Sequence, residues 1–151
     1  MVTIKDTIVV ERPVEAVWRF VSDPNYTPRW FEGACVIRRA PEGSLAIGAT
    51  FEVAVQAGGV SQVIGARCTV LDQNRTVAWQ FTSGPTEHST DTWCTEAVGE
   101  SLTRLTRAFD LRVSGVWTLL QPIIVQGTRK AHAAEIKNVK RILESRESPS
   151  T

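Results

Sequence analysis

Two pairs of ionisable side chains have the residue types and the spacing that acid–base chemistry needs. His132 and Glu135 are three positions apart, so on a helix their side chains share one face and lie close enough to touch. A carboxylate beside an imidazole can act as an acid–base pair in which Glu135 raises the basicity of His132. Two other interpretations stay open: a pair that only satisfies its own hydrogen bonds, or a Glu135 that bridges to an arginine on a sheet.

The second pair, Asp91 and Arg107, comes from two segments with the alternating pattern of strands. Successive strand residues point to opposite faces, so Asp91 faces the interior if Trp93 does. By the same rule Arg107 faces the interior if Leu105 and Phe109 do. An inward arginine without a carboxylate partner is very costly. We therefore expect Asp91 and Arg107 to be a buried pair on neighbouring strands, holding each other or gripping a polar group of a ligand.

Other chemistries have little support in the sequence. The two histidines belong to no HExxH motif or acidic cluster, so we expect no metal site. There is no GxSxG motif around a serine and no phosphate-binding GxxxxGK(S/T) motif, and we expect no cofactor. The cysteines, Cys35, Cys68 and Cys94, are far apart and form no CxxC pair. Their spacing argues against a disulfide framework and for a reducing cytoplasm.

The composition indicates an ordinary globular domain. The 151 residues are 42% hydrophobic and 22% charged, which is enough to bury a sizeable core. The formal net charge of +1 gives no broad field that favours nucleic acid or an anionic membrane. No apolar run reaches the ~20 residues that span a bilayer, and the first residues lack the apolar run of a secretion signal. We expect a cytoplasmic protein without an integral membrane segment, and its oligomeric state stays open.

The elements that must position these side chains begin with a long amphipathic helix, expected over residues 115–145. At roughly 100° per residue an apolar stripe runs along it, with Trp117, Ile124, Ala131, Val139 and Ile142. Four polar residues lie within the stripe: Gln121, Thr128, His132 and Glu135. A buried face with such groups is expected to line a cavity, because polar side chains pack poorly in a solid core. Pro122 can rotate the first turns relative to the rest.

The rest of the chain has the pattern of a sheet with two short helices near its beginning. A strand is expected over residues 3–11, a helix from Pro13 to Ser22, a second short helix over 25–30, and about six strands over 33–113. Gly65, inside one of these strands, is expected at a bulge. We expect one domain over residues 1–146 and a disordered tail over 147–151.

This order of elements indicates an α+β fold in which a curved antiparallel sheet wraps around the C-terminal helix. Five tryptophans against one tyrosine are unusual at this size, and a large cavity needs bulky walls. The residues expected to line the cavity are Trp30, Phe51, Val53, Trp79, Phe81, Trp93 and Phe109, with Trp117, Gln121, Ile124 and Thr128 from the helix.

Several short motifs give the chain a family resemblance. They are Arg12-Pro13, Val17-Trp18, Ser22-Asp23-Pro24, Trp30, Gly48-Ala49-Thr50-Phe51, the turn and strand over 98–106, and Leu143-Glu144. In this order they resemble the SRPBCC superfamily, also called START-like or Bet v 1-like, and within it the polyketide cyclase/dehydrase and lipid-transport branch. The resemblance implies a helix-grip fold whose deep cavity takes hydrophobic small molecules. The family has no universal catalytic residues, so the resemblance implies a pocket and not a mechanism.

We expect the protein to bind a polyketide-, aromatic- or lipid-like small molecule in this cavity, as a carrier or sensor. The alternative is a polyketide cyclase or dehydratase that holds its substrate in a reactive shape, with His132, Glu135, Asp91 or Arg107 moving protons. A third class, a chaperone-like module that binds a partner, predicts an exposed apolar patch outside the cavity.

Overall fold

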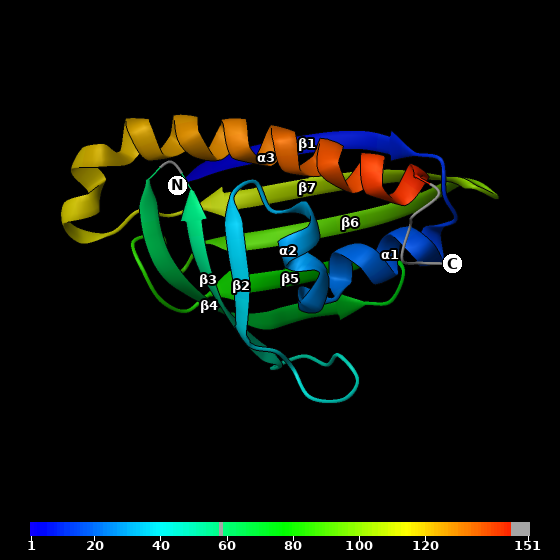
Figure 1. The fold of residues 1–151 in the computed structure, drawn as a ribbon, viewed down its shortest axis with the longest axis horizontal. Coiled ribbons are helices and arrows are strands. Elements are labelled where there is room, and N and C mark those ends of the chain that lie inside the picture. The colour runs from blue at the N-terminus through cyan, green and yellow to red at the C-terminus, as the bar shows by residue number, and fades with distance from the viewer. Residues whose placement is uncertain (58, 146–151) are drawn as a thin grey trace.

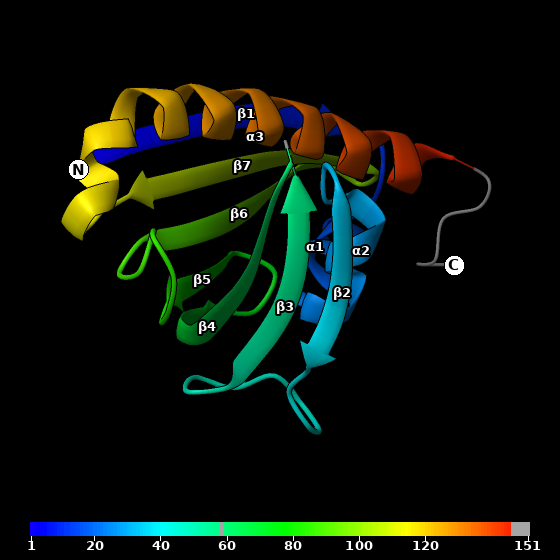
Figure 2. The ribbon, with the colours of Figure 1, turned by 60° about the vertical axis from the view of Figure 1, so that its left-hand side comes forward.

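The computed structural model describes residues 1–57 and 59–145. Within them one antiparallel sheet contains β1 (Val2–Val10), β2 (Ala34–Arg39), β3 (Thr50–Ala57), β4 (Val60–Asp72), β5 (Thr76–Phe81), β6 (Thr90–Gly99) and β7 (Leu102–Leu111). The order across the sheet is β1-β7-β6-β5-β4-β3-β2, so β1 pairs with the last strand and every other neighbour is also a neighbour in sequence. Figure 2 shows the sheet bending until β2 and β3 rise toward the long helix.

The helices pack against this bent sheet (Figure 1). They are α1 (Val14–Ser22), the 3₁₀ turn η1 (Pro24–Tyr26), α2 (Thr27–Trp30), the 3₁₀ helix η2 (Gly115–Leu120) and α3 (Gln121–Glu144). α3 runs along β1 and β7, while α2 lies between β2 and α3. The α+β helix-grip fold expected from the sequence, with two short helical pieces after the first strand, is confirmed.

The long helix begins later than the sequence pattern predicts. Residues 115–120 form a 3₁₀ helix, and the α-helix starts at Gln121. Pro122 occupies the first turn of α3, where its missing N–H leaves no hydrogen bond unmade. A 3₁₀ helix has three residues per turn instead of 3.6, so the apolar stripe does not continue in phase into η2. Trp117 therefore faces outward with 44% of its surface exposed, and its expected place in the cavity wall is wrong.

Bulges bend the sheet, but not at the glycine expected to do so. Gly65 sits in regular register opposite Glu52, whereas the register shift in β4 lies between Cys68 and Val70. A Cβ on residue 65 would come within 2.8 Å of the Thr82 hydroxyl. Gly65 is thus needed for the close approach of the segment that follows β5, and the predicted bulge at this position is wrong.

The C-terminal half of α3 joins the main core, and its N-terminal half covers a smaller one. Ile136, Val139, Ile142 and Leu143 pack in the cluster that also contains residues of α1 and the sheet. The second cluster consists of Ile4, Phe109 and Leu111, with Ile124 and Val125 of α3 among the residues packed on it. The two halves of the helix therefore rest on different parts of the sheet.

Three hydrogen bonds fix the end of α3 to the end of β1 and the residues that follow it. Arg12 Nη1 donates to the carbonyl of Leu143 at 2.7 Å, and the Glu11 amide donates to Glu144 Oε2 at 2.7 Å. Lys140 Nζ donates to the carbonyl of Val9 at 2.6 Å.

No helix among the described residues has the length and apolar character needed to cross a membrane. The predicted tail, 147–151, lies outside the described residues, and the domain limit at 146 stays a prediction.

Candidate functional site

A buried cluster of one arginine and two carboxylates ties the sheet to the long helix. Arg107 Nε donates to Asp91 Oδ1 at 2.9 Å, and Nη2 donates to Asp91 Oδ2 at 2.7 Å. Arg107 Nη1 donates to Glu135 Oε1 at 2.6 Å. The second oxygen of Glu135 accepts the backbone amide of Glu32 at 3.1 Å. The Arg107 and Glu135 side chains are 5% and 3% exposed, so water screens these contacts very little.

Strand geometry explains why Asp91 and Arg107 meet. Arg107 on β7 stands directly opposite Trp93 on β6, and Asp91 is two residues away from Trp93 on the same face. Such a diagonal pair is within reach of a long side chain. The two N–H groups of Arg107 match the two oxygens of the carboxylate, which is the strong bidentate arrangement. The buried pair expected from the alternation of these strands is confirmed, while a catalytic role for either residue stays a prediction.

Two neighbouring indole rings contact the guanidinium. The Arg107 Cζ lies 4.6 Å from the ring centre of Trp93 and 5.1 Å from that of Trp30. The two rings lie edge to face with their centres 5.3 Å apart. Aromatic faces attract a cation that has lost its water, so both tryptophans help to keep the buried charge in place. Trp30 comes from α2, and the contact therefore also fixes this short helix against the sheet.

The cluster shifts the pKa values of its members. Burial opposes the charge on Arg107, but the carboxylates of Asp91 and Glu135 hold its pKa above the usual value. Burial raises the pKa of Glu135, and the charge and hydrogen bond of Arg107 partly oppose this. One cation between two carboxylates leaves one uncompensated negative charge when both are ionised. This excess of negative charge disfavours the binding of a further carboxylate beside the cluster.

His132 is separate from this cluster. Its side chain lies with its ring centre 5.0 Å from that of Phe109, and it is 8% exposed. Among the described residues, no hydrogen bond or ion pair joins it to Glu135, and its buried Nδ1 has no hydrogen-bond partner. Burial, with a smaller effect of the charge on Arg107, lowers the pKa of His132 to about 3. Of the interpretations open for Glu135, the structure shows the bridge to a sheet arginine.

A small internal space lies beside the cluster, between the sheet and the α1–α2 segment. Its volume is about 70 Å³. Its lining residues are Val21, Pro24, Thr27, Trp30, Phe31, Phe51, Val53, Val55, Ile64, Trp79, Phe81, Asp91, Trp93 and Arg107. The wall is mostly aromatic and aliphatic, and the polar residues of the cluster form one end of it. An apolar cavity that holds benzene has about 150 Å³, so this space is smaller than the deep cavity that the family resemblance implies, and that cavity stays a prediction.

Most of the residues that we expected in the cavity wall from the sheet and α2 are in this lining, and those expected from the long helix are not. Trp30, Phe51, Val53, Trp79, Phe81 and Trp93 line the space together with Asp91 and Arg107. Phe109 and Ile124 instead pack in the second cluster. The Thr128 hydroxyl donates to the carbonyl of Ile124 at 2.8 Å, and Gln121 is half-buried at the start of α3. His132 and Glu135 are buried near the space but do not line it.

Several residues of the lining were missed by the sequence analysis. Val55 continues the alternation of Phe51 and Val53 along β3, so its inward direction was readable from the pattern. Ile64 lies directly opposite Val53 on the neighbouring strand β4, so its side chain is on the same face of the sheet. Phe31 and the Glu32 amide were not readable, because they follow a helix of four residues whose direction depends on tertiary packing.

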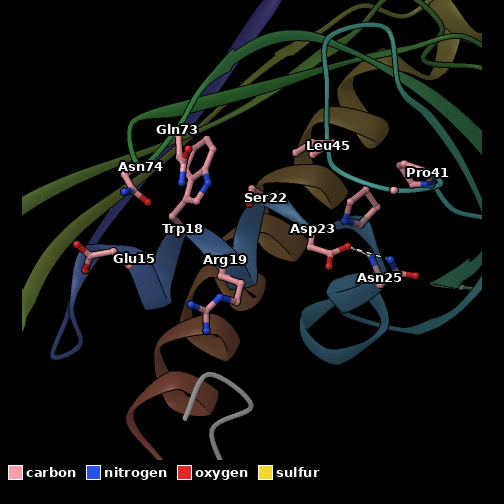
Figure 3. A pocket seen from close by; sticks show the side chains of 12 residues that line it. Glu15, Trp18, Arg19, Ser22, Asp23, Asn25, Pro41, Leu45, Gln73 and Asn74 are labelled. Carbon is pink, nitrogen blue, oxygen red and sulfur yellow. Dashed lines mark hydrogen bonds between the residues drawn. The ribbon is translucent and has the colours of Figure 1, made fainter.

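A larger cleft, of about 410 Å³, lies elsewhere (Figure 3). It is bounded by α1, by the loop around Pro41 and Leu45, and by the turn at Gln73 and Asn74. Its charged lining residues have both signs, Glu15 and Asp23 against Arg19. We place the candidate site in the smaller space, because it combines buried charges held in a fixed geometry with an apolar wall, and such a combination is typical of functional sites.

The described residues offer little for metal or thiol chemistry. No group of three His, Cys, Asp or Glu side chains among them is placed to hold a metal ion. Cys35 is near the cluster, and burial, followed by the negative charge of Glu135, raises the pKa of its thiol to about 11. A thiol with this pKa is protonated at neutral pH and is a poor nucleophile.

Replacing Arg107 with methionine should destabilise the fold by about 3–5 kcal/mol, because it leaves two buried carboxylates without a cation. The matched control is the triple change Asp91→Asn, Arg107→Met and Glu135→Gln, which removes all three charges and should cost less than Arg107→Met alone. Urea unfolding of both proteins at pH 7 measures the difference. A loss below about 1 kcal/mol for the single variant would contradict a buried charge cluster.

Replacing His132 with leucine should make the protein less sensitive to acid. The folded pKa is about 3 against 6.5 for a free imidazole. As the pH falls from 6.5 toward 3, the unfolded chain therefore binds a proton that the folded protein does not. This lowers the free energy of unfolding by at most about 1.4 kcal/mol per pH unit, and above pH 6.5 the effect vanishes.

Urea unfolding of the wild type and of His132→Leu at pH 7 and pH 5 tests this sign. The raised pKa of Glu135 acts in the opposite direction, but it is common to both proteins and cancels in the comparison. Equal acid losses in the two proteins would show that His132 is not buried as a neutral group.

Solved structures of low sequence identity share the fold. The aromatase/cyclase Zhui from Streptomyces sp. R1128 superimposes with a TM-score of 0.76 at 15% identity, over 93% of this chain and 92% of that chain. TTHA0849 from Thermus thermophilus gives a TM-score of 0.74 at 12% identity, over 93% and 95%. The Aha1 dimer from Colwellia psychrerythraea gives 0.64 at 17% identity, over 95% and 97%. At these identities the likeness shows the fold alone.

The sequence comparisons show the family. A search of curated proteins gives no match. The model of the family described as polyketide cyclase/dehydrase and lipid transport matches residues 1–144, which is nearly the whole chain, and the likeness to the aromatase/cyclase fold agrees with it. The chain therefore belongs to the polyketide cyclase/dehydrase and lipid transport family, within the SRPBCC superfamily.

Proposed function

We propose that this protein binds an apolar, ring-containing small molecule in the space between the sheet and α2, as a carrier or sensor. The observation that carries the proposal is the asymmetry of the lining. Phe51, Trp79 and Phe81 form an aromatic wall, and the polar end beside them is already neutralised in large part by Arg107. An apolar guest can lie against this wall without leaving a buried charge unpaired.

The polar end favours a guest with an acceptor oxygen. The indole Nε1 of Trp30 is buried and has no hydrogen-bond partner among the described residues, and Trp30 lines the space. A buried N–H without a partner costs about 1–3 kcal/mol. A carbonyl or phenol oxygen on the guest would satisfy this donor, and such oxygens are typical of aromatic polyketides and related ring compounds.

Binding requires the wall to open. A volume of about 70 Å³ is smaller than one aromatic ring needs, so the guest must displace side chains. Phe31, Phe51 and Phe81 are half-buried where the rest of the core is buried. These three rings are therefore the part of the wall that moves at the lowest cost, while Trp93 and Arg107 stay fixed.

The missing CxxC pairs support a reducing cytoplasm as the place of this function.

Filling the space should abolish binding. The variant Ile64→Phe places a ring where the guest would lie and should weaken the binding of 2-naphthol about ten-fold or more. The matched control is Val63→Phe, because Val63 is the next residue along β4, points to the opposite face and is 38% exposed. Quenching of tryptophan fluorescence by 2-naphthol measures both.

Dodecanol serves as a second probe, since it has an alkyl chain, no ring and no charge. Equal weakening of 2-naphthol binding by Ile64→Phe and Val63→Phe would place its site outside the internal space. No binding of either probe to the wild type would contradict the carrier proposal.

A cyclase or dehydratase remains the second candidate, and His132 is the observation that favours it. Its buried Nδ1 has no hydrogen-bond partner among the described residues, although a pKa lowered to about 3 by burial makes the imidazole a weak base. Glu135 and Asp91, by contrast, are held by Arg107. His132 is thus the member of the predicted catalytic set that no ion pair occupies. Because it does not line the space, this candidate requires that the substrate open the wall to reach His132 and raise the pKa of its imidazole toward neutral.

Turnover of a dehydration substrate separates the two candidates. In 4-hydroxy-4-phenylbutan-2-one, a base removes a proton next to the carbonyl, and this proton returns to the hydroxyl group, which leaves as water. The product is a conjugated ketone, and its absorbance measures the reaction. An enzyme should form this product, and His132→Gln should abolish formation while 2-naphthol binding is unchanged. Product formation equal to that of buffer alone would leave the carrier function.

A further inference from the structure

An apolar tip projects from the end of the fold where α3 begins. We define it as Val116, Trp117, Leu119, Leu120 and Ile123, which are 79%, 44%, 87%, 44% and 71% exposed. In both views η2 extends beyond the ends of the neighbouring strands (Figures 1 and 2). Soluble proteins expose single apolar residues freely, but a contiguous group of this kind marks a surface that contacts another apolar phase.

The tip is held firmly although its side chains point outward. The Gln121 amide donates to the carbonyl of Thr118, which joins η2 to α3. Ile124 and Val125, directly after the tip, pack on the second core cluster. The Ser114 amide donates to the carbonyl of Pro85 at 3.4 Å. The outward direction of the tip is therefore a property of the fold and not of a loose end.

The segment that carries the tip has charges of one sign. Residues 111–134 contain Arg112, Arg129 and Lys130 but no Asp or Glu, and these three cations are exposed. The nearest acidic residue on the adjoining loop, Glu87, lies 3.4 Å from the ring of His88. A net charge of +1 for the whole chain thus conceals a locally basic, apolar end.

We propose that the apolar tip docks on an anionic lipid surface, with its aliphatic side chains in the boundary region of the bilayer and Arg129 and Lys130 at the headgroups. Exposed aliphatic residues, a tryptophan and flanking cations are the features of a segment that lies in the interface without crossing it. A second copy of the chain is less favoured, because two such tips would bring cations of the same sign together.

Docking at this place would put the lipid next to a series of packed apolar side chains that reaches the internal space. Ile124 and Val125 pack on the cluster of Phe109, and the ring of Phe109 lies 5.5 Å from that of Phe81. Phe81 in turn lines the internal space. The docking itself rests on the surface of the tip, so it does not depend on the proposed cavity binding.

Sedimentation with lipid vesicles tests the proposal. The wild type should bind vesicles of phosphatidylcholine with phosphatidylglycerol, and the double variant Leu119→Gln and Ile123→Gln should bind about ten-fold or more weakly, because it removes two side chains from the bilayer boundary. The matched control, Val36→Gln and Ile47→Gln, changes residues that are 63% and 66% exposed elsewhere and should bind like the wild type. All the replaced side chains are exposed, so folding is preserved.

A second variant tests the charge. Arg129→Gln with Lys130→Gln should weaken binding to the anionic vesicles and make it less sensitive to salt, with little change on pure phosphatidylcholine. Equal vesicle binding by the wild type and the Leu119/Ile123 variant would overturn the proposal. The proposal would also be overturned if the wild type did not bind vesicles but formed a dimer or bound an acidic protein, and the Leu119/Ile123 variant lost that interaction.

Discussion

The contact on which the rest of the structure depends is the double ion pair of Arg107. Its guanidinium binds Asp91 within the sheet and Glu135 on α3, at 2.6–2.9 Å, and lies against the neighbouring rings of Trp93 and Trp30. Sheet, long helix and α2 thus meet at one cation. Buried charges stabilise a fold less than apolar packing does, but they tolerate only one arrangement, because any other leaves a charge unpaired. The cluster therefore fixes how the sheet grips the helix.

This constraint also shapes the internal space. With Arg107 occupied by two carboxylates, the polar end of the space cannot rearrange freely, so any opening must occur at the aromatic side, where Phe31, Phe51 and Phe81 are half-buried. The same occupation explains why Asp91 and Glu135 suit a structural role better than proton transfer. His132 stands apart, neutral and without a partner at Nδ1 among the described residues. A fixed cluster of charges at one end and an aromatic wall that can rearrange at the other are the features that the proposed binding of an apolar ring requires.

The fold and half of the site were readable from the sequence. Alternation along β6 and β7 was enough to pair Asp91 with Arg107, because strand neighbours are set by register. The helical period predicted that Glu135 faces inward. Which sheet residue it meets depends on how far the helix is shifted along the sheet, and this is set by packing, so the sequence did not identify Arg107 as its partner. Trp117 was misplaced because η2 has the 3₁₀ period. The stacking of Trp30, and the small volume of the space, depend on a four-residue helix and on ring rotamers that no periodicity encodes.

The indole N–H resonances of the five tryptophans test the central claim most directly, because these residues divide among the candidate surfaces. Trp30, Trp79 and Trp93 line the internal space, Trp18 lines the outer cleft, and Trp117 belongs to the tip. On titration with 2-naphthol, followed by ¹H–¹⁵N correlation NMR, the first three resonances should shift together, Trp30 most, while those of Trp18 and Trp117 stay in place. Shifts confined to Trp18 or Trp117, or no shift at saturating probe, would contradict binding between sheet and helix.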